Sequence, residues 1–205
     1  MTKILSIDSS ANPMPSVSRQ LSLELRNGLK AKYPDAQEVY YDVVNKPYPF
    51  FTPEVATAWY TATADRTTEQ QKIVALSDKL INEVKDADHL IISSPMYNLG
   101  IPAQLKTWID QIVRVNETFK YNTDGSSTGL LNPNKTTLYI VSAFGGTYDG
   151  DAAAYNMNSQ YVAAIMGWLG LTNQKHIMAQ GLNMGDEARN KGIHEASEQI
   201  KNILK

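Results

Sequence analysis

The sequence predicts an α/β fold built on a doubly wound, five-stranded parallel sheet with helices on both faces. Two observations carry this prediction. Short apolar runs of strand length alternate along the chain with segments whose apolar residues recur at helical spacing. Strands that are joined through helices form βαβ units, and such units produce a parallel sheet that helices cover on both sides.

The strands are expected in five apolar runs, at residues 3–8, 38–44, 89–93, 136–142 and 174–179. The helices are expected between and after these runs, where apolar residues fall on one helical face. The helical stripes are Leu21, Leu25 and Leu29; Ile73, Leu76, Leu80 and Val84; Leu105, Trp108, Ile109, Ile112 and Val113; Tyr161, Val162, Ile165, Met166 and Leu169; and Ile193, Ala196, Ile200 and Ile203. Thr67 and Gln70 have the spacing of a capping box before the second helix. Five strands and five helices suit the flavodoxin-like strand order 2-1-3-4-5.

Two segments interrupt this alternation. Residues 45–66 are rich in proline and aromatic side chains, and we expect them to form a loop and a short helix over the sheet. Residues 116–134 contain an Asp-Gly-Ser-Ser-Thr-Gly stretch, which predicts an excursion or a small hairpin.

Length and composition limit the class of protein. The chain has 205 residues, which suits a single domain over residues 1–205. A net charge of −2 without any basic run argues against a nucleic-acid partner. Cysteine is absent, and His89, His176 and His194 are scattered, so no metal site is expected. Because no signal peptide or membrane-spanning apolar stretch is found, we expect a cytoplasmic protein with no membrane partner.

The turn after the first strand is rich in hydroxyl groups. Ser16 and Ser18 stand at the start of the first helix, with Ser10 on the facing side of the turn. Hydroxyls and the free amides of a helix N-terminus bind a phosphate monoester well. The alternative interpretation is that these serines are ordinary caps and turn formers.

The turn after the third strand contains Pro95, Met96, Tyr97, Asn98 and Leu99. Tyr97 and Met96 suit packing against a flat ring, and Asn98 with the turn amides suits its polar edge. The carboxyl ends of strands are the favoured ligand crevice of open α/β sheets. The alternative is that Pro95 and Tyr97 only end the strand and fill a gap.

The turn after the fourth strand reads Ala143-Phe144-Gly145-Gly146. A glycine pair after a strand lets the backbone approach a ligand closely, although it also suits a plain flexible turn. The three turns follow strands expected to lie side by side, so they open at one edge of the sheet. One turn offers phosphate ligands and two offer ring contacts, which is the layout of a flavin mononucleotide (FMN) site.

With these motifs in place, the chain resembles the bacterial FMN-dependent NAD(P)H azoreductases and quinone reductases over essentially its whole length. The resemblance rests on Ser9-Ser10 with Ser16-Val17-Ser18, on Pro95-Met96-Tyr97-Asn98 followed by Gln104-Leu105-Lys106, on Thr118-Phe119-Lys120-Tyr121, and on Gly145-Gly146. It implies a flavodoxin-like fold, bound FMN, and a homodimer with two active sites at its interface.

The resemblance also implies roles for particular residues. Ser10 and residues 16–18, which include Val17, are expected to hold the FMN phosphate. Pro95 and residues 96–99, together with residues 143–146, are expected to line the isoalloxazine ring. Some relatives have Ser-Arg-Gly-Gly where this chain has Ala143-Phe144-Gly145-Gly146, so we expect Phe144 to replace a charged donor near the ring with an apolar surface.

The activity implied is reduction of quinones, and cleavage of aromatic azo compounds to amines, at the expense of NADH or NADPH. Donor and acceptor would share one pocket, which predicts ping-pong kinetics, and the flavin N5 rather than a protein residue would carry the hydride. Tyr121 and Tyr148 would shape the substrate mouth or serve only as packing aromatics. The alternatives are a flavodoxin-type electron carrier for protein partners and a non-catalytic α/β binding module.

Overall fold

The computed structural model describes residues 1–12 and 15–205 of the chain. Its centre is a parallel sheet with the strand order β2-β1-β3-β6-β7. The strands are β1 (Lys3–Asp8), β2 (Gln37–Asp42), β3 (His89–Pro95), β6 (Thr137–Ala143) and β7 (Gln174–Ala179). The predicted flavodoxin-like order is confirmed, and the predicted strands differ from these bounds by at most two residues at either end.

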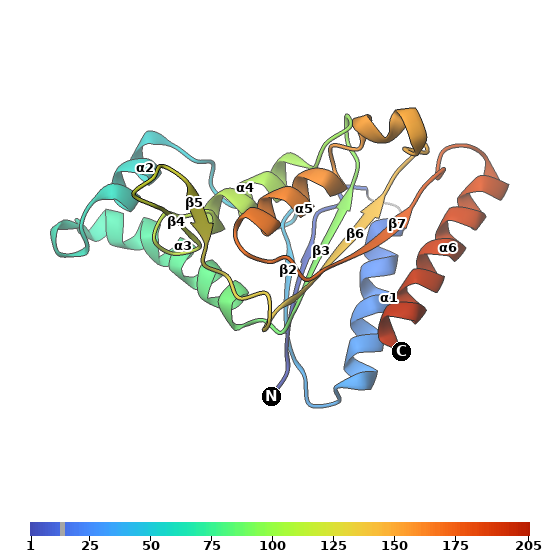
Figure 1. The fold of residues 1–205 in the computed structure, drawn as a ribbon, viewed down its shortest axis with the longest axis horizontal. Helices are drawn as coiled ribbons and strands as arrows, with labels where there is room; N and C mark the ends of the chain where they lie inside the picture. Colours follow the sequence, from blue (N-terminus) through green and yellow to red (C-terminus); the bar gives the residue numbers. More distant parts are fainter. Residues whose placement is uncertain (13–14) are drawn as a thin grey trace.

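Helices cover both faces of the sheet, as expected (Figure 1). On one face lie α1 (Val17–Lys32) and α6 (Asp186–Leu204), which pack against each other. On the other lie α3 (Thr68–Asp86), α4 (Ala103–Ile112) and α5 (Ser159–Trp168). Each face has its own apolar core, because the sheet separates the buried side chains of α1 and α6 from those of the other three helices.

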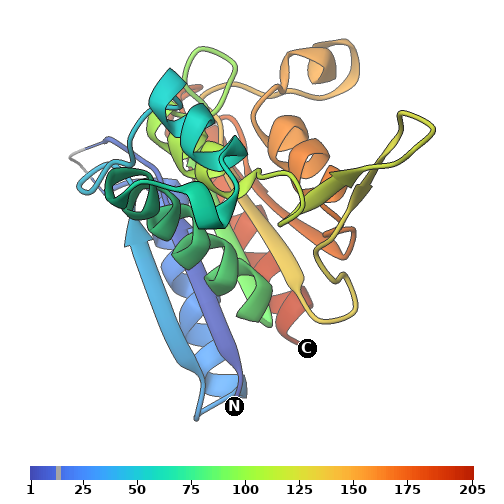
Figure 2. The ribbon, with the colours of Figure 1, turned by 90° about the vertical axis from the view of Figure 1, so that its left-hand side faces the viewer.

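The two irregular segments lie on the side of the sheet that α3, α4 and α5 cover. Residues 45–66 contain α2 (Pro53–Tyr60), which packs on α3, and the short helical turn η1 (Thr63–Asp65). Residues 116–134 form an antiparallel hairpin of β4 (Phe119–Tyr121) and β5 (Ser127–Gly129), which projects from the body of the molecule (Figure 2). A further short helical turn, η2 (Gly150–Tyr155), precedes α5.

Local sequence signals explain where several elements begin. The predicted capping box before α3 is confirmed: the amide of Gln70 donates to the Thr67 hydroxyl at 3.2 Å, and the amide of Thr67 donates to the Gln70 side chain at 2.9 Å. Thr52 caps α2, whose first residue is Pro53. No helix within residues 1–12 and 15–205 combines the length and the apolar character that crossing a membrane requires.

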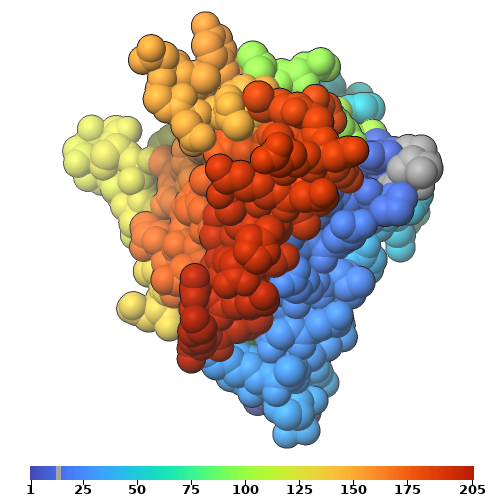
Figure 3. Space-filling view, turned by 90° about the vertical axis from the view of Figure 1, so that its right-hand side faces the viewer, coloured from blue at the N-terminus to red at the C-terminus, as the bar shows by residue number. Residues whose placement is uncertain are grey.

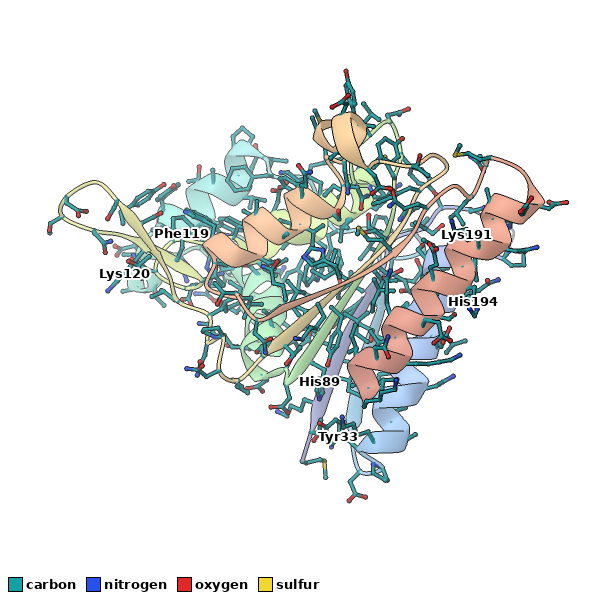
Figure 4. The ribbon with its side chains drawn as sticks, turned by 45° about the vertical axis from the view of Figure 1, so that its right-hand side comes forward. Tyr33, His89, Phe119, Lys120, Lys191 and His194 are labelled. Carbon is teal, nitrogen blue, oxygen red and sulfur yellow. The ribbon has the colours of Figure 1, made fainter. Side chains whose placement is uncertain are left out.

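Figure 4 shows His89 at the amino end of the sheet and His194 on α6, while His176 is exposed within β7. His89 starts β3 between the rings of Tyr33 and Tyr139, and its Nδ1 lies 3.1 Å from the Tyr139 hydroxyl. Burial lowers the pKa of His89 below its ordinary value because it disfavours the charged ring. His194 is exposed on α6. The role of His89 is therefore structural: its ring packs between two tyrosine rings at the amino end of the sheet.

Candidate functional site

The three predicted turns meet at the carboxyl edge of the sheet. Asp8 at the end of β1 is in register with Ser93, and Pro95 at the end of β3 is in register with Ala143. The amide of Met96 donates to the carbonyl of Ala143 at 2.9 Å, so the turns after β3 and β6 stay together beyond the last strand pair. A cavity of about 150 Å³ lies between the turns.

Predicted site residues form most of the walls of this cavity, which we call the edge cavity. Those that line it are Ser10, Ser16, Val17, Pro95, Met96, Tyr97, Ala143 and Gly145. Ser18, Asn98, Leu99, Phe144 and Gly146 lie in the same turns without lining it. Asn12, Pro15, Leu182, Asn183 and Arg189 also line the cavity and were not predicted. Leu182 and Asn183 come from the segment between β7 and α6, for which no structure was predicted, and Arg189 is the fourth residue of α6.

The turn between β1 and α1, which contains Ser10 and Ser16 and which we call the serine turn, presents hydrogen-bond donors toward the edge cavity. Ser16 is the N-cap of α1, and its hydroxyl lies 3.1 Å from that of Ser18, which is fully buried. Ser10 is also buried, and its hydroxyl accepts a hydrogen bond from the amide of Asn12 at 3.3 Å. The first amides of α1 have no partner within the helix, and they carry the positive end of its dipole. The turn is thus suited to an anionic group.

An arginine holds the backbone of this turn in place. The Nε and Nη2 atoms of Arg19 donate to the carbonyl of Ser10 at 3.2 and 2.7 Å. The same guanidinium forms an ion pair with Asp42 at 2.9 Å and donates to the Tyr40 hydroxyl at 3.2 Å. The Tyr40 hydroxyl donates in turn to the buried carboxyl of Asp8 at 3.1 Å. Burial raises the pKa of Asp8 above its ordinary value, because it disfavours the charged form.

The turn after β3, at residues 96–99, is a tight reversal. We call it the ring turn, after its predicted contact with a flat ring. The amide of Tyr97 donates to the carbonyl of Gly100, and the amide of Gly100 donates back to Tyr97, both at 3.0 Å. Asn98 and Leu99 between them have φ values of 50° and 68°, as a type I′ turn requires. The Tyr97 hydroxyl accepts a hydrogen bond from the amide of Ala11 at 3.1 Å, so this side chain connects the ring turn to the serine turn.

The buried side chain of Asn158 anchors this turn through hydrogen bonds, a role that was not predicted from the sequence. Its side chain is fully buried, and its Nδ2 donates to the Ser94 hydroxyl at 2.8 Å and to the carbonyls of Pro95 and Gly100 at 2.9 and 3.1 Å. Its Oδ1 accepts from the Ser142 hydroxyl at 3.3 Å. One amide therefore joins the end of β3, the ring turn and β6. An asparagine before a helix suggests only a cap, so no sequence signal revealed this role.

The turn after β6 is paired with the turn after β7. The carbonyl groups of Phe144, Gly145 and Gly146 accept hydrogen bonds from the amides of Leu182, Asn183 and Gly181, respectively. The backbone also approaches a side chain closely here, since a Cβ added to Gly145 would lie 2.6 Å from Nδ2 of Asn183. These contacts place the β7–α6 segment against the edge cavity.

Phe144 corrects one expectation. Its side chain is fully buried and meets the ring of Tyr148 edge to face, with centroids 5.6 Å apart. Because the side chain is enclosed by the protein, it adds no apolar surface to the edge cavity. Contact of Phe144, or of any other predicted residue, with a cofactor remains a prediction.

The two predicted substrate residues lie in different places. Tyr148 follows the glycine turn and packs on Phe144. Tyr121 is on β4, 67% exposed, with its ring at right angles to that of Phe119. The hairpin carrying Tyr121 projects away from the carboxyl edge of the sheet (Figures 1 and 2). The structure therefore does not bring Tyr121 to the edge cavity of its own chain.

The model of a protein family described by a flavodoxin-like fold matches residues 2–204. The chain belongs to this flavodoxin-like family. Within it, the chain is 40% identical over 205 residues to the FMN-dependent NADH:quinone oxidoreductase of Herminiimonas arsenicoxydans, covering 100% of this chain and 99% of the relative. It is 39% identical to FMN-dependent NADH:quinone oxidoreductase 2 of Trichormus variabilis, covering 98% and 97%.

Solved structures of the flavodoxin-like family agree with the sequence comparison. An azoreductase from Bacillus anthracis str. Sterne superposes with a TM-score of 0.90 at 30% identity, over 100% of this chain and 99% of that one. An FMN-dependent NADH-azoreductase from Bacillus anthracis str. Ames Ancestor, solved in complex with FMN, superposes with a TM-score of 0.86 at 25% identity over the whole of both chains.

Proposed function

We propose that this protein is an FMN-dependent NADH oxidoreductase that reduces quinones and cleaves aromatic azo compounds. The observation that carries the proposal is the edge cavity, where the serine turn meets the turns after β3 and β6, the three turns predicted to hold the phosphate and the ring. Full-length similarity to FMN-dependent NADH:quinone oxidoreductases and to azoreductases supports it. NADH is an intracellular reductant, which supports the cytoplasmic location expected from the sequence.

The chemistry of the edge cavity fits FMN. Ser10, residues 16–18 and the first amides of α1 would hold the phosphate, because they combine hydroxyl and N–H donors at the positive end of a helix. The turn at residues 96–99 would lie against the isoalloxazine ring. Gly145 and Gly146, which carry no side chains, would let the backbone come close to the ring edge.

Bound FMN would supply the hydride chemistry, since flavins accept hydride from nicotinamides and pass it to quinones or azo groups. The residues of the chain would bind and orient the ring. Tyr97 would tie the ring turn to the phosphate turn, because its hydroxyl accepts from the amide of Ala11. Asn158 would keep the ring turn in its reversed form through the carbonyls of Pro95 and Gly100.

The expected result is a yellow protein that oxidises NADH when a small quinone is added. Ping-pong kinetics should appear as parallel double-reciprocal lines, because both substrates use one pocket. Absorbance in the flavin region and NADH consumption with menadione measure both properties. A colourless protein that binds no added FMN would contradict the proposal, whereas a yellow protein without quinone turnover would favour the flavodoxin-type carrier.

We also propose that the active form is a homodimer in which a second copy docks on the groove beside the ring turn. This groove, of about 750 Å³, is lined by residues that include Gly100, Ile101, Met157 and Tyr161. Met157 is 56% exposed there although it is apolar. Gly100 belongs to the ring turn itself, so a second copy seated here would complete the wall of the cofactor site. Tyr121, which lies far from the edge cavity of its own chain, would then be available to the site of the other copy.

The mass in solution tests the homodimer. Sedimentation equilibrium should give twice the chain mass of 22.8 kDa. Met157→Glu should shift the protein toward the monomer, because it places a charge in an apolar contact. An exposed residue outside the groove, Lys191, offers the control Lys191→Glu, which should leave the mass unchanged. A monomeric wild-type protein with full quinone turnover would contradict the proposal.

A further inference from the structure

We propose that Arg189 is an additional phosphate ligand and makes the site select FMN over flavins that lack a phosphate. The inference rests on the proposed function, and it adds a residue from α6 that the sequence analysis did not include. Arg189 is the fourth residue of α6, and it lines the edge cavity together with Ser10 and Ser16 of the serine turn.

Charge in the edge cavity is unbalanced. Among the described residues that line it, Arg189 is the only one with a charged side chain; the others are apolar, hydroxyl, amide or glycine residues. A cation beside hydroxyl and amide donors produces a site for an anion, and a guanidinium matches the oxygen geometry of a phosphate. No carboxylate lines the cavity within the described part of the chain to neutralise it.

Within the described part of the chain, Arg189 also has no acidic partner. It is half-buried, and its Nη1 donates one long hydrogen bond of 3.4 Å, to the carbonyl of Leu182. Within residues 1–12 and 15–205, no carboxylate lies within ion-pair distance of it. Arg19 on α1 is different, because Asp42 neutralises its charge and the Ser10 carbonyl occupies its donors. Arg189 therefore keeps donors and charge for a ligand, whereas Arg19 holds the fold.

The packing of α6 directs Arg189 toward the serine turn. Helices α1 and α6 lie side by side and both begin at the carboxyl edge of the sheet (Figures 1 and 3). Arg189 precedes buried Gly192 by three residues, so it shares the helix face that packs inward. Lys191, on the exposed surface of the same helix, has Glu195 as its nearest acidic partner, at 3.9 Å (Figure 4).

Two flavins test the inference. FMN and riboflavin share the ring and the ribityl chain and differ in the phosphate. Their dissociation constants for the apoprotein can be measured by quenching of flavin fluorescence at low and at moderate salt. We expect Arg189→Gln to weaken FMN binding by about 10- to 100-fold, the range for a lost charge-assisted hydrogen bond, and to change riboflavin binding less than about twofold. The salt dependence of FMN binding should fall as well.

Two further variants and a measurement of folding complete the design. Arg189→Lys should recover part of the FMN affinity, because it keeps the charge without the forked donors. Lys191→Gln removes one positive charge two residues further along α6, on its exposed surface, and should leave both flavin affinities unchanged. Circular dichroism melting curves establish that each variant is folded, and if Arg189→Gln melts early, Arg189→Met, which also removes the charge, replaces it as the test.

The outcomes separate this inference from the function it rests on. If FMN and riboflavin weaken equally in Arg189→Gln, or if FMN binding does not change, the inference is wrong while the proposed function stands. If the wild-type protein binds neither flavin, the proposed function and the inference are both wrong.

Discussion

Replacing Asn158 with aspartate is expected to lower the free energy of unfolding by about 3 kcal/mol or more and to weaken FMN binding at least tenfold. The Nδ2 atom of Asn158 donates to the carbonyls of Pro95 and Gly100. An aspartate would place a buried carboxylate oxygen against these two carbonyls, and neither can donate a hydrogen bond to it. The ring turn would lose its attachment to β3 and β6, and the cofactor site would lose its shape.

Asn156→Asp is the matched control for this change. The Oδ1 atom of Asn156 accepts a hydrogen bond from the amide of Ser159 at 3.2 Å, a role that a carboxylate oxygen fills equally well. Its negative charge would also lie near the first turn of α5, where the helix dipole favours it. We therefore expect Asn156→Asp to stay within about 1 kcal/mol of the wild type in urea denaturation. Equal losses in the two variants would contradict the assignment of Asn158 as the anchor of the turn.

The second large effect is expected at Gly192, where alanine should cost about 2–3 kcal/mol of stability. A Cβ at this position would lie 2.1 Å from the carbonyl oxygen of Gln180, and the backbone of Gln180 has little freedom to move. Helix α6 would have to shift away from the end of β7. Because Arg189 lies one turn earlier in α6, the shift would also displace it from the edge cavity. Urea denaturation and the FMN dissociation constant measure the two consequences.

Gly28→Ala is the same substitution in another helix, with the opposite expectation. A Cβ on Gly28 would meet the Cδ1 atom of Leu204 at 2.2 Å, but this is the far end of a flexible side chain near the chain terminus. Alanine also favours the helix over glycine by about 1 kcal/mol. We expect Gly28→Ala to be neutral or slightly stabilising. A comparable loss in both variants would show that close packing of α6 on β7 does not explain the effect.

The sequence was most informative about the sheet and its turns. The five strands and their order were predicted because apolar runs and helical stripes are local signals, and crossover connections of βαβ units leave few topologies. Strand ends were less certain. The third strand was predicted at residues 89–93. In the structure β3 continues to Pro95, since β6 pairs with it as far as Ala143.

The candidate site was predicted in part for the same reason. The serine, Pro-Met-Tyr-Asn and Gly-Gly turns could be placed at one edge because each follows a strand whose neighbours were predicted. The orientation of single side chains could not be predicted this way. Phe144 was expected to present an apolar surface near the ring, and its side chain is fully buried against Tyr148 instead.

The strand order, the turns that meet at the carboxyl edge and the resemblance that implies FMN could all be predicted before the fold was known. These conclusions depend on periodicity, turn-forming residues and motif spacing, all of which are local. The roles argued for Asn158, Gly192 and Arg189, in contrast, could be inferred only from the folded chain. Each role depends on backbone atoms or cavity walls that come from distant parts of the chain. Local sequence patterns do not show which of these parts lie within a few ångströms of one another in the fold.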